Sequence, residues 1–310
     1  MWEIRRSKAE DACAGLAIPI FIRNMQYHLT TADVYADGAI HVWEFVDLPL
    51  FDEKLRKGWV WPAPPEGGRI SVFNLGFSDC VDGNWQHTPQ SIRSEVQKAL
   101  RSLNPGLQGL IDMHGSNVEQ TGKVRTMKMG GGLSRPPIKR SNEGSIDFGK
   151  EKIPVFVAEG TQFRLEPLFV FADGSLRIGA HEPFVNLEYV KDAFLTGRLT
   201  TQVPDASRIT IEGLGSFTTA RGMWNVKPEE RIREIESTSN QLKGEQDPIV
   251  ICRAAFAAFH KDPIPENRAA LKIAYEAVPE HLRCYCGDMD SKDSLIRCAL
   301  QNDDNEAANS

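Results

Sequence analysis

The densest group of side chains that could carry out chemistry lies near the C-terminus. It combines one imidazole, two thiols and three carboxylates: His281, Cys284, Cys286, Asp288, Asp290 and Asp293. Imidazoles and thiolates are the side chains that hold zinc. However, only one residue separates the two cysteines, and no second cysteine pair follows at the spacing of a zinc ribbon. We therefore predict no metal site and no cofactor; His281, Cys284 and Cys286 are the residues that would ligate a metal.

Signatures of catalysis are incomplete elsewhere in the chain. His181 and Glu182 are adjacent and could act as acid and base. The glycines at 115 and 122 are too widely spaced for a phosphate loop, and no Gly-x-Ser-x-Gly elbow occurs. We therefore predict no catalytic residues. If the chain is an enzyme, its most plausible polar groups are His181, Glu182, His281, Asp288 and Asp290.

The strongest pattern is an internal duplication. With a constant offset of 139 residues, thirteen of the 51 positions from 45 to 95 are identical, without a gap. The match extends upstream, where Ile18–Ile22 resembles Ile153–Val157. A segment that occurs twice inside the chain reads as a strand of each copy rather than as a signal peptide. A long period with only two copies indicates a duplicated domain and not a solenoid.

The two copies predict the same local structure. Ala-Asp-Gly at 36–38 and 172–174 predicts a tight hairpin turn, and Asp47 and Asn186 are suited to cap a short helix. Gly58 and Gly197 follow that helix, and Pro89 and Pro228 begin a longer one. A second turn is expected at Asp82-Gly83 and at the equivalent Arg221-Gly222. The fold class is therefore α+β: two tandem copies of an antiparallel-sheet-plus-helix module.

Residues that differ between the copies are the better guide to function, because shared residues mostly serve the common fold. Trp59 and Trp61 of copy one correspond to Arg198 and Thr200 of copy two. On a strand, residues two apart point to the same side. Two interpretations stay open: the tryptophans cover the core of copy one, or they form a partner-binding face. Trp59 and Trp61 are therefore the candidate partner-binding residues.

The remaining segments complete the predicted organisation. Residues 114–147 are rich in Gly, Pro, Ser and Lys and predict a flexible basic linker. Helical patterns begin at Asp247-Pro248 and Pro265-Glu266, and a last helix follows Asp290-Ser291 to about Leu300. The predicted domains are these: copy one at 13–113, linker at 114–147, copy two at 148–245, helical C-terminal region at 246–300 and disordered tail at 301–310.

Composition narrows the class of partner. The chain has 36 Lys and Arg against 42 Asp and Glu, a net charge of −6. This balance argues against nucleic acid as the main partner, because phosphate binding needs a basic surface. No apolar run approaches the length of a membrane helix. Six cysteines without regular spacing suggest reduced thiols. We expect a cytoplasmic protein that does not bind membranes.

Two parts of the sequence resemble families of uncharacterised bacterial domains. The first resemblance rests on Tyr35–Ile40, Trp43, Val46–Leu48, Gly58–Val60, Pro65–Gly67 and Ile70-Ser71. The second rests on Pro279–Tyr285 and Gly287–Asp293. Such families are associated with immunity-type proteins of bacterial toxin systems. The resemblance brings no catalytic residues with it.

These observations lead to one functional expectation and one alternative. The expected function is a non-enzymatic cytosolic binding protein that neutralises a bacterial toxin by direct binding. An acidic chain would suit a basic toxin through complementary potentials. The alternative is an enzyme with a site between the two copies or against the C-terminal helices. The partner is expected to be a protein; its identity stays open.

Overall fold

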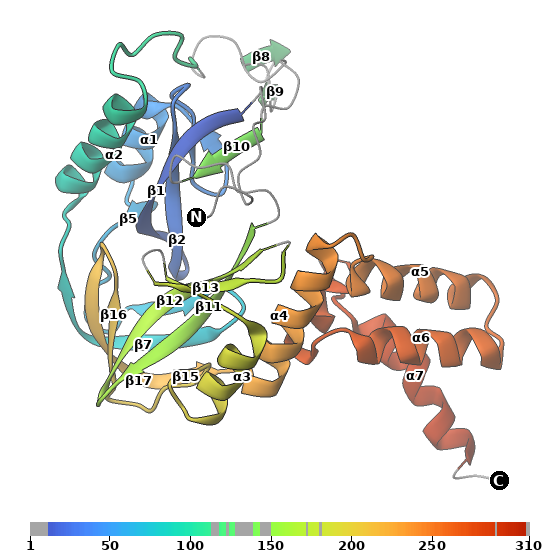
Figure 1. Cartoon of the computed structure of the whole chain (residues 1–310). Coiled ribbons are helices and arrows are strands. Elements are labelled where there is room, and N and C mark those ends of the chain that lie inside the picture. Colours follow the sequence, from blue (N-terminus) through green and yellow to red (C-terminus); the bar gives the residue numbers. More distant parts are fainter. Residues whose placement is uncertain are drawn as a thin grey trace. The chain divides into compact units, whose positions relative to one another are not determined.

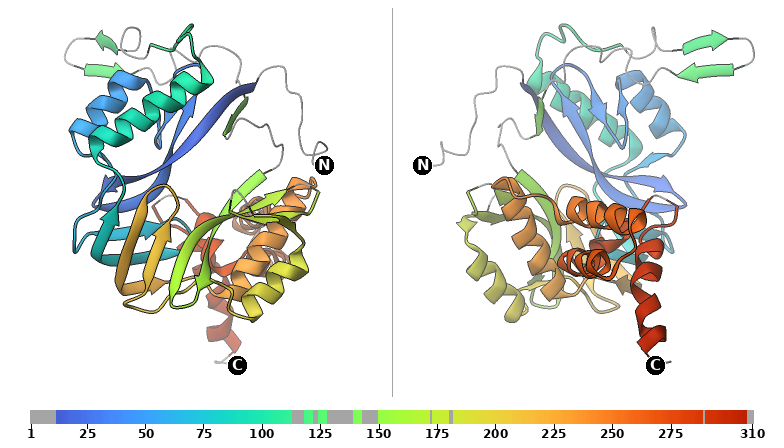
Figure 2. Two further views of the ribbon diagram at one scale, coloured as in Figure 1. Left: turned by 60° about the vertical axis from the view of Figure 1, so that its left-hand side comes forward. Right: turned by 90° about the vertical axis from the view of Figure 1, so that its right-hand side faces the viewer.

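A computed structural model describes residues 12–112, 118–121, 124–127, 139–142, 150–171, 173–179, 182–288 and 290–307 (Figures 1 and 2). The chain divides into two compact units. Unit 1 comprises Met1–Phe148, Phe156–Glu166 and Val203–Trp224, and unit 2 comprises Gly149–Val155, Pro167–Gln202 and Asn225–Ser310. The units differ from the two sequence copies because part of copy two belongs to unit 1.

Copy one alternates strands with two helices. Its elements are β1 (Ala12–Asn24), β2 (Gln26–Tyr35), β3 (Ile40–His41), β4 (Phe45–Val46), α1 (Leu48–Arg56), β5 (Val60–Trp61), β6 (Arg69–Val72), β7 (Gly76–Trp85) and α2 (Pro89–Leu103). β2 and β6 pair in parallel, whereas the strand pairs β1–β2 and β6–β7 are antiparallel. The sheet is therefore mixed, not purely antiparallel.

Copy two repeats this order of elements. They are β11 (Lys150–Glu159), β12 (Gln162–Phe171), β13 (Leu176–Ile178), β14 (Phe184–Val185), α3 (Leu187–Leu195), β15 (Leu199–Thr200), β16 (Arg208–Ile211), β17 (Gly215–Trp224) and α4 (Pro228–Leu242). From β4 onward, every element begins and ends 139 residues after its counterpart in copy one. The predicted duplication and the α+β class are confirmed.

The predicted helix signals act as expected. The Asp47 carboxylate accepts a hydrogen bond from Leu50 N at 3.0 Å, and the side-chain oxygen of Asn186 accepts one from Tyr189 N at 2.9 Å. Gly58 and Gly197 follow these helices at φ values of 69° and 74°. Thr88 caps α2 through a capping box with Ser91. Each cap satisfies backbone donors that the first helical turn leaves unpaired.

The first core of unit 1 lies between its helices and one face of the sheet. Figure 1 shows α1 and α2 side by side against β1 and β2. The apolar faces of these elements meet in a cluster that includes Ile20, Ile22, Phe51, Ile92 and Val96. All five side chains are fully buried. Burial of an aliphatic or aromatic side chain stabilises a fold by about 1.5–3 kcal/mol, so this cluster fixes α1 on the sheet.

The two copies join edge to edge inside unit 1. β7 pairs with β17 in antiparallel register, which places Gly76 opposite Trp224, Cys80 opposite Thr219 and Trp85 opposite Gly215. Under the 139-residue offset, Cys80 and Thr219 are equivalent positions, and the other two pairs are the same pair with the copies exchanged. The seam thus has the geometry of a two-fold symmetric dimer interface within one chain. Burial raises the pKa of the Cys80 thiol at its centre to about 11.

Charges on one side of the seam bind the copies together. The Asp79 carboxylate, which is nearly buried, forms ion pairs with Arg69 at 3.0 Å and with Arg221 of β17 at 2.5 Å. Because Asp79 lies on β7, the Arg221 contact crosses between the copies.

The equivalent positions on the other side carry different charges. Arg208, the counterpart of Arg69, pairs with Asp82 of β7 at 2.7 Å. Thr218 stands where copy one has Asp79, and its hydroxyl donates to Asp82 at 2.8 Å. Asp82 is itself the counterpart of Arg221. Asp82 in copy one and Arg221 in copy two therefore form ion pairs when copy one pairs with copy two. A pairing of two identical copies would bring like charges together at these positions.

The prediction of turns at Asp82-Gly83 and Arg221-Gly222 is wrong. β7 and β17 continue through both sites, with register irregularities in the β7–β17 ladder near Thr219 and between Ala220 and Met223. The local turn signal is overridden because each strand pairs with its counterpart from the other copy, a partner that sequence periodicity does not reveal. The turn that joins β6 to β7 lies earlier, at Asn74, whose φ is 55°.

The C-terminal region of unit 2 is helical, as predicted. Its elements are α5 (Pro248–Lys261), α6 (Pro265–Ala277), the 3₁₀ helix η2 (Glu280–Tyr285) and α7 (Ser294–Ala307). Figure 1 shows α5 and α6 side by side. They share a core that includes Cys252, Leu271, Val278 and Ile296. α7 extends to Ala307 rather than ending near Leu300, where the sequence predicts a disordered tail, because no Pro or Gly interrupts residues 301–307; residues 308–310 lie outside the described part.

Part of the predicted linker is described. It contains β8 (Val118–Thr121), β9 (Val124–Met127) and β10 (Lys139–Asn142). β8 and β9 pair with each other, and β10 pairs in parallel with β1. The remaining linker residues lie outside the described part, so its flexibility and the domain boundaries drawn from the sequence stay predictions.

Gly76 and Gly215 should be the most sensitive glycines of the seam. They adopt φ values of 147° and 135°, and an added Cβ would lie 2.2 Å from Met223 O and 2.3 Å from Asn84 O, respectively. We expect either change to Ala to lower the free energy of unfolding by about 3 kcal/mol or more, since strain and overpacking add. Urea unfolding followed by circular dichroism measures this effect.

Gly67→Ala is the matched control. Its φ is 75°, but a Cβ would meet no atom within 4 Å. The substitution therefore isolates backbone strain, for which we expect a loss of about 1–2 kcal/mol. Equal losses for Gly67→Ala and Gly76→Ala would contradict the close approach of β7 and β17.

Candidate functional site

Trp43 lies at the tip of a tight turn between β3 and β4. The backbone N–H of Val42 donates to Glu44 O at 2.9 Å, and the flanking residues His41 and Phe45 pair directly. Trp43 adopts a φ of 68°, and 46% of the residue is exposed. A bulky side chain in the left-handed region is strained, and such strain concentrates at functional positions. The turn separates β3 from β4.

Trp43 belongs to an aromatic group on the surface of copy one. Its ring meets the His28 ring edge-on at 5.1 Å and the Trp59 ring at 6.1 Å. The Lys54 ammonium of α1 lies 4.0 Å from the centre of the Trp59 ring, a cation–π distance. Trp59 also packs against the core that includes Ile22. Its ring is therefore held in place, whereas Trp43 presents exposed aromatic surface beside it.

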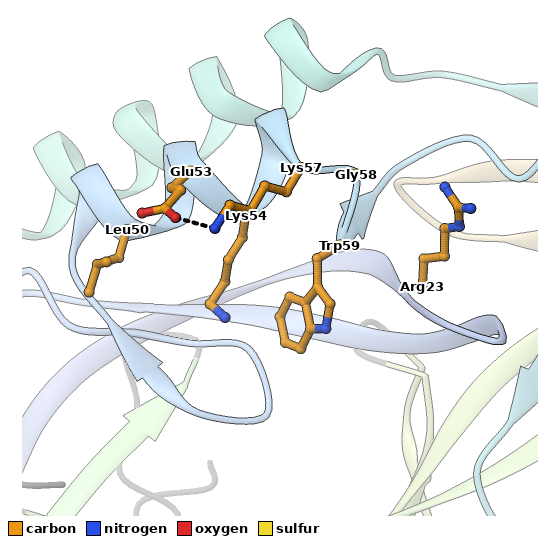
Figure 3. A pocket seen from close by; sticks show the side chains of 7 residues that line it. All are labelled: Arg23, Leu50, Glu53, Lys54, Lys57, Gly58 and Trp59. Atoms are coloured by element: carbon orange, nitrogen blue, oxygen red, sulfur yellow. Dashed lines mark ion pairs between the residues drawn. The ribbon is translucent and has the colours of Figure 1, made fainter. Parts of the chain in front are cut away.

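A pocket of about 490 Å³ opens next to Trp59. Figure 3 shows the side chains that line it: Arg23, Leu50, Glu53, Lys54, Lys57, Gly58 and Trp59. α1 supplies three of these residues, the segment that follows α1 supplies Lys57, Gly58 and Trp59, and the end of β1 supplies Arg23. The volume falls in the range of pockets that hold a drug-sized ligand or a few side chains of a partner. The aromatic group and this pocket together are called the tryptophan face below.

Only one of the two predicted tryptophans lines the pocket. Trp59 does, while Trp61 donates its indole N–H to Ala63 O at 2.8 Å and pairs with Phe21 in the strand ladder. Sequence reasoning did not place Trp43 or Arg23 at the site. Trp43 carried a signal as a tryptophan absent from copy two, but nothing in the sequence showed that its turn brings it next to Trp59.

The chemistry of this face is specific to copy one. The counterparts of Trp43 and Trp59 under the 139-residue offset are Glu182 and Arg198. In copy two the Arg198 guanidinium lies over the Tyr189 ring at 4.2 Å. The fold tolerates both arrangements, so it does not require the tryptophans of copy one.

A second polar cluster joins copy two to the C-terminal helices within unit 2. His281 Nε2 lies 2.8 Å from a Glu234 carboxylate oxygen, and Glu234 also binds the guanidinium of Arg231. All three side chains are largely buried, and Arg231 is fully buried. Burial lowers the pKa of Arg231, while the adjacent Glu234 carboxylate acts in the opposite direction. The counterpart of Arg231 in copy one is Ile92, a core residue.

Further contacts strengthen this junction. Glu230 accepts from the backbone N–H of Glu280 at 2.5 Å, and Arg233 donates to Glu276 O at 2.6 Å. Burial raises the pKa of Glu230, but hydrogen bonds from the Glu280 N–H and from Arg233 bring the net pKa below its ordinary value. The cluster joins α4 to the C-terminal helices, and the His281 side chain within it is nearly buried.

The other side chains that could ligate a metal near the C-terminus take part in local contacts. Burial raises the pKa of Cys284, and contact with Cys252 together with burial raises that of Cys286. Asp288 accepts hydrogen bonds from Asp290 N and from Ser291, which lower its pKa. Among the described residues, no group of three or more His, Cys, Asp or Glu side chains is placed to hold a metal ion.

Four of the five residues named for an enzyme are described, and these four do not converge on one site. His181 lies outside the described residues, and Glu182 is exposed before β14. His281 contacts Glu234, and Asp288 accepts a hydrogen bond from Ser291 N within its own loop. Asp290 is exposed.

In the part of the chain that the structure describes, no helix is both long and apolar enough to cross a membrane.

Comparisons with known proteins match families and not individual proteins. The sequence model of a domain of unknown function (DUF7638) matches residues 3–107 and again residues 149–246, more than half of the chain. A second domain of unknown function (DUF7639) matches residues 247–309. No curated protein and no solved structure matches the chain significantly. The boundary between the two families falls between α4 and α5.

Trp43→Asn should alter the tryptophan face without unfolding the protein. Asn tolerates the left-handed region, so relief of about 1–2 kcal/mol of strain offsets the lost ring contacts. We expect the free energy of unfolding to change by less than about 1 kcal/mol in thermal or urea unfolding. A loss above about 2 kcal/mol would show that Trp43 is part of the structural core.

Substitutions in the buried junction, unlike Trp43→Asn, should lower the free energy of unfolding strongly. Glu234→Gln leaves the Arg231 charge buried without its carboxylate, and we expect a loss of about 3–5 kcal/mol. Arg231→Ile restores the residue found in copy one, so we expect it to cost less than Glu234→Gln by about 2 kcal/mol. Urea unfolding of the two variants makes the comparison, and the reverse order would refute this account of the junction.

Proposed function

The chain belongs to the family of the domain of unknown function DUF7638, and we propose that it is a non-enzymatic binding protein whose tryptophan face contacts a protein partner. Exposed aromatic rings beside a partly charged pocket are typical of the centre of a protein interface. The single observation that carries the proposal is Trp43, half-exposed and held in a strained conformation beside Trp59.

The difference between the copies supports a specialised face. The residues of the fold recur in both copies, whereas the two tryptophans do not. The left-handed region is strained for a tryptophan, so a role outside the fold accounts for Trp43 better. A rigid aromatic ring loses little conformational entropy on binding, which suits it to anchor a partner.

We place the chain among cytoplasmic, bacterial immunity-type proteins as part of the same proposal. Neutralising a toxin requires only tight binding, and the exposed ring of Trp43 beside Trp59 supports this proposal. The net charge of −6 suggested a basic toxin, but the pocket itself carries three cations and one carboxylate. The charge at the face therefore does not follow the charge of the whole chain.

Co-expression with neighbouring gene products tests this function. Each product that is toxic when expressed alone is expressed together with the chain, and we expect growth to be restored for one of them. Trp43→Ser should abolish rescue, because a truncated interface anchor costs about 2 kcal/mol or more of binding free energy.

Tyr189→Ser is the matched control, since Tyr189 is an exposed aromatic residue on the helix of copy two that corresponds to α1. It should leave rescue intact, and circular dichroism should show both variants folded. Rescue that survives Trp43→Ser, or turnover of a small molecule without any protein partner, would contradict the proposed function.

A further inference from the structure

We infer that the pocket beside Trp59 receives an acidic side chain from a segment of the protein partner, and that Arg23 is the residue that binds its carboxylate. This inference rests on the proposed function and adds the chemistry of the partner. It follows from the position of Arg23, the charge of the pocket and the residues that replace it in copy two.

Arg23 is placed firmly at the mouth of the pocket. Its backbone N–H donates to Trp59 O at 2.8 Å, which fixes the end of β1 against the loop that carries Trp59. A Cβ added to Gly58 would lie 3.9 Å from the Arg23 guanidinium, so this group extends over the loop. Figure 3 shows Arg23 and Lys54 on either side of Trp59. A guanidinium can offer two parallel hydrogen bonds to a carboxylate.

Arg23 supplies the unbalanced charge of the pocket. Lys57 pairs with Glu53 at 2.5 Å, and Lys54 pairs with Glu44. Within the described residues, the Arg23 side chain forms no ion pair or hydrogen bond, and the residue is exposed. One cation is thus available for an incoming anion, while the two lysines are already neutralised.

Copy two lacks each cation of this pocket. Aligning Ile18–Ile22 with Ile153–Val157 places Ala158 where copy one has Arg23. The 139-residue offset places Ala193 and Thr196 where copy one has Lys54 and Lys57. Glycine stands after the helix in both copies, so the loop is shared scaffold. The cations are therefore dispensable for the fold and specific to this face.

The local charge favours a peptide over a nucleic acid. Glu44 and Glu53 lie beside the lysines and would repel the successive phosphates of an oligonucleotide. A peptide needs only one carboxylate at Arg23, and its neighbouring apolar or aromatic side chain can cover Trp43 and Trp59. We therefore commit to an acidic segment with an adjacent aromatic or large apolar residue.

Selection from a displayed library of random peptides tests this inference on the full chain. We expect the selected peptides to contain Asp or Glu next to an aromatic or large apolar residue. For the strongest of these peptides, Arg23→Gln should raise the dissociation constant about tenfold or more, which corresponds to about 1.4 kcal/mol. Replacing the acids of the peptide by their amides should have an effect of similar size.

Arg56→Gln is the matched control, because Arg56 is an exposed arginine on α1 that does not line the pocket. We expect it to change the dissociation constant by less than about twofold, within the small effect of a peripheral charge. Selected peptides without acids, equal effects of Arg23→Gln and Arg56→Gln, or displacement of the peptide by a more tightly bound single-stranded oligonucleotide would overturn the inference.

The rescue assay separates this inference from the proposed function. If Trp43→Ser abolishes rescue and Arg23→Gln does not, the tryptophan face binds the partner but the carboxylate assignment is wrong. If both variants keep full rescue, the proposed function fails as well. Loss of rescue in both, with rescue kept by Arg56→Gln, supports the inference.

Discussion

The antiparallel pairing of β7 with β17 is the contact on which the remainder of unit 1 depends. It makes one sheet from strands of two copies, and Cys80 and Thr219 face each other at its centre as equivalent residues. Nothing in a two-fold geometry by itself prevents like copies from pairing. The exchange of acid and base between Asp82 and Arg221 does so, because it leaves each side balanced only when one copy meets the other.

Once this shared scaffold exists, each copy can change outside it. Copy one carries tryptophans and cations around α1 that copy two lacks, and they form the tryptophan face. Copy two has replaced the core residue Ile92 by Arg231, whose charge needs Glu234 and therefore His281 of the C-terminal region. A buried ion pair of this kind adds little stability in itself, but it makes the position of one element depend on another. The two copies thus divide their roles: one presents a surface, and the other holds the second domain.

The sequence allowed much of this fold to be predicted. Caps at Asp47 and Asn186, helix ends at Gly58 and Gly197 and the repeat itself are local signals, and two copies of each signal reinforce one another. The strands through Asp82-Gly83 were missed because a turn signal was overridden by a partner strand far along the chain. Of the site, Trp59 was found as a residue that only copy one has. Trp43 and Arg23 were missed because a strained turn and a β1–β5 contact, neither visible in periodicity, bring them to it.

Hydrogen exchange followed by mass spectrometry tests the joined sheet most directly. If β7 and β17 form one ladder, peptides covering them should exchange slowly and to a matching degree, because neither strand can open without the other. The terminal strand β10 should exchange faster than both. Slow exchange in β7 together with fast exchange in β17 would contradict a seam between the copies, and with it the division of roles that the seam makes possible.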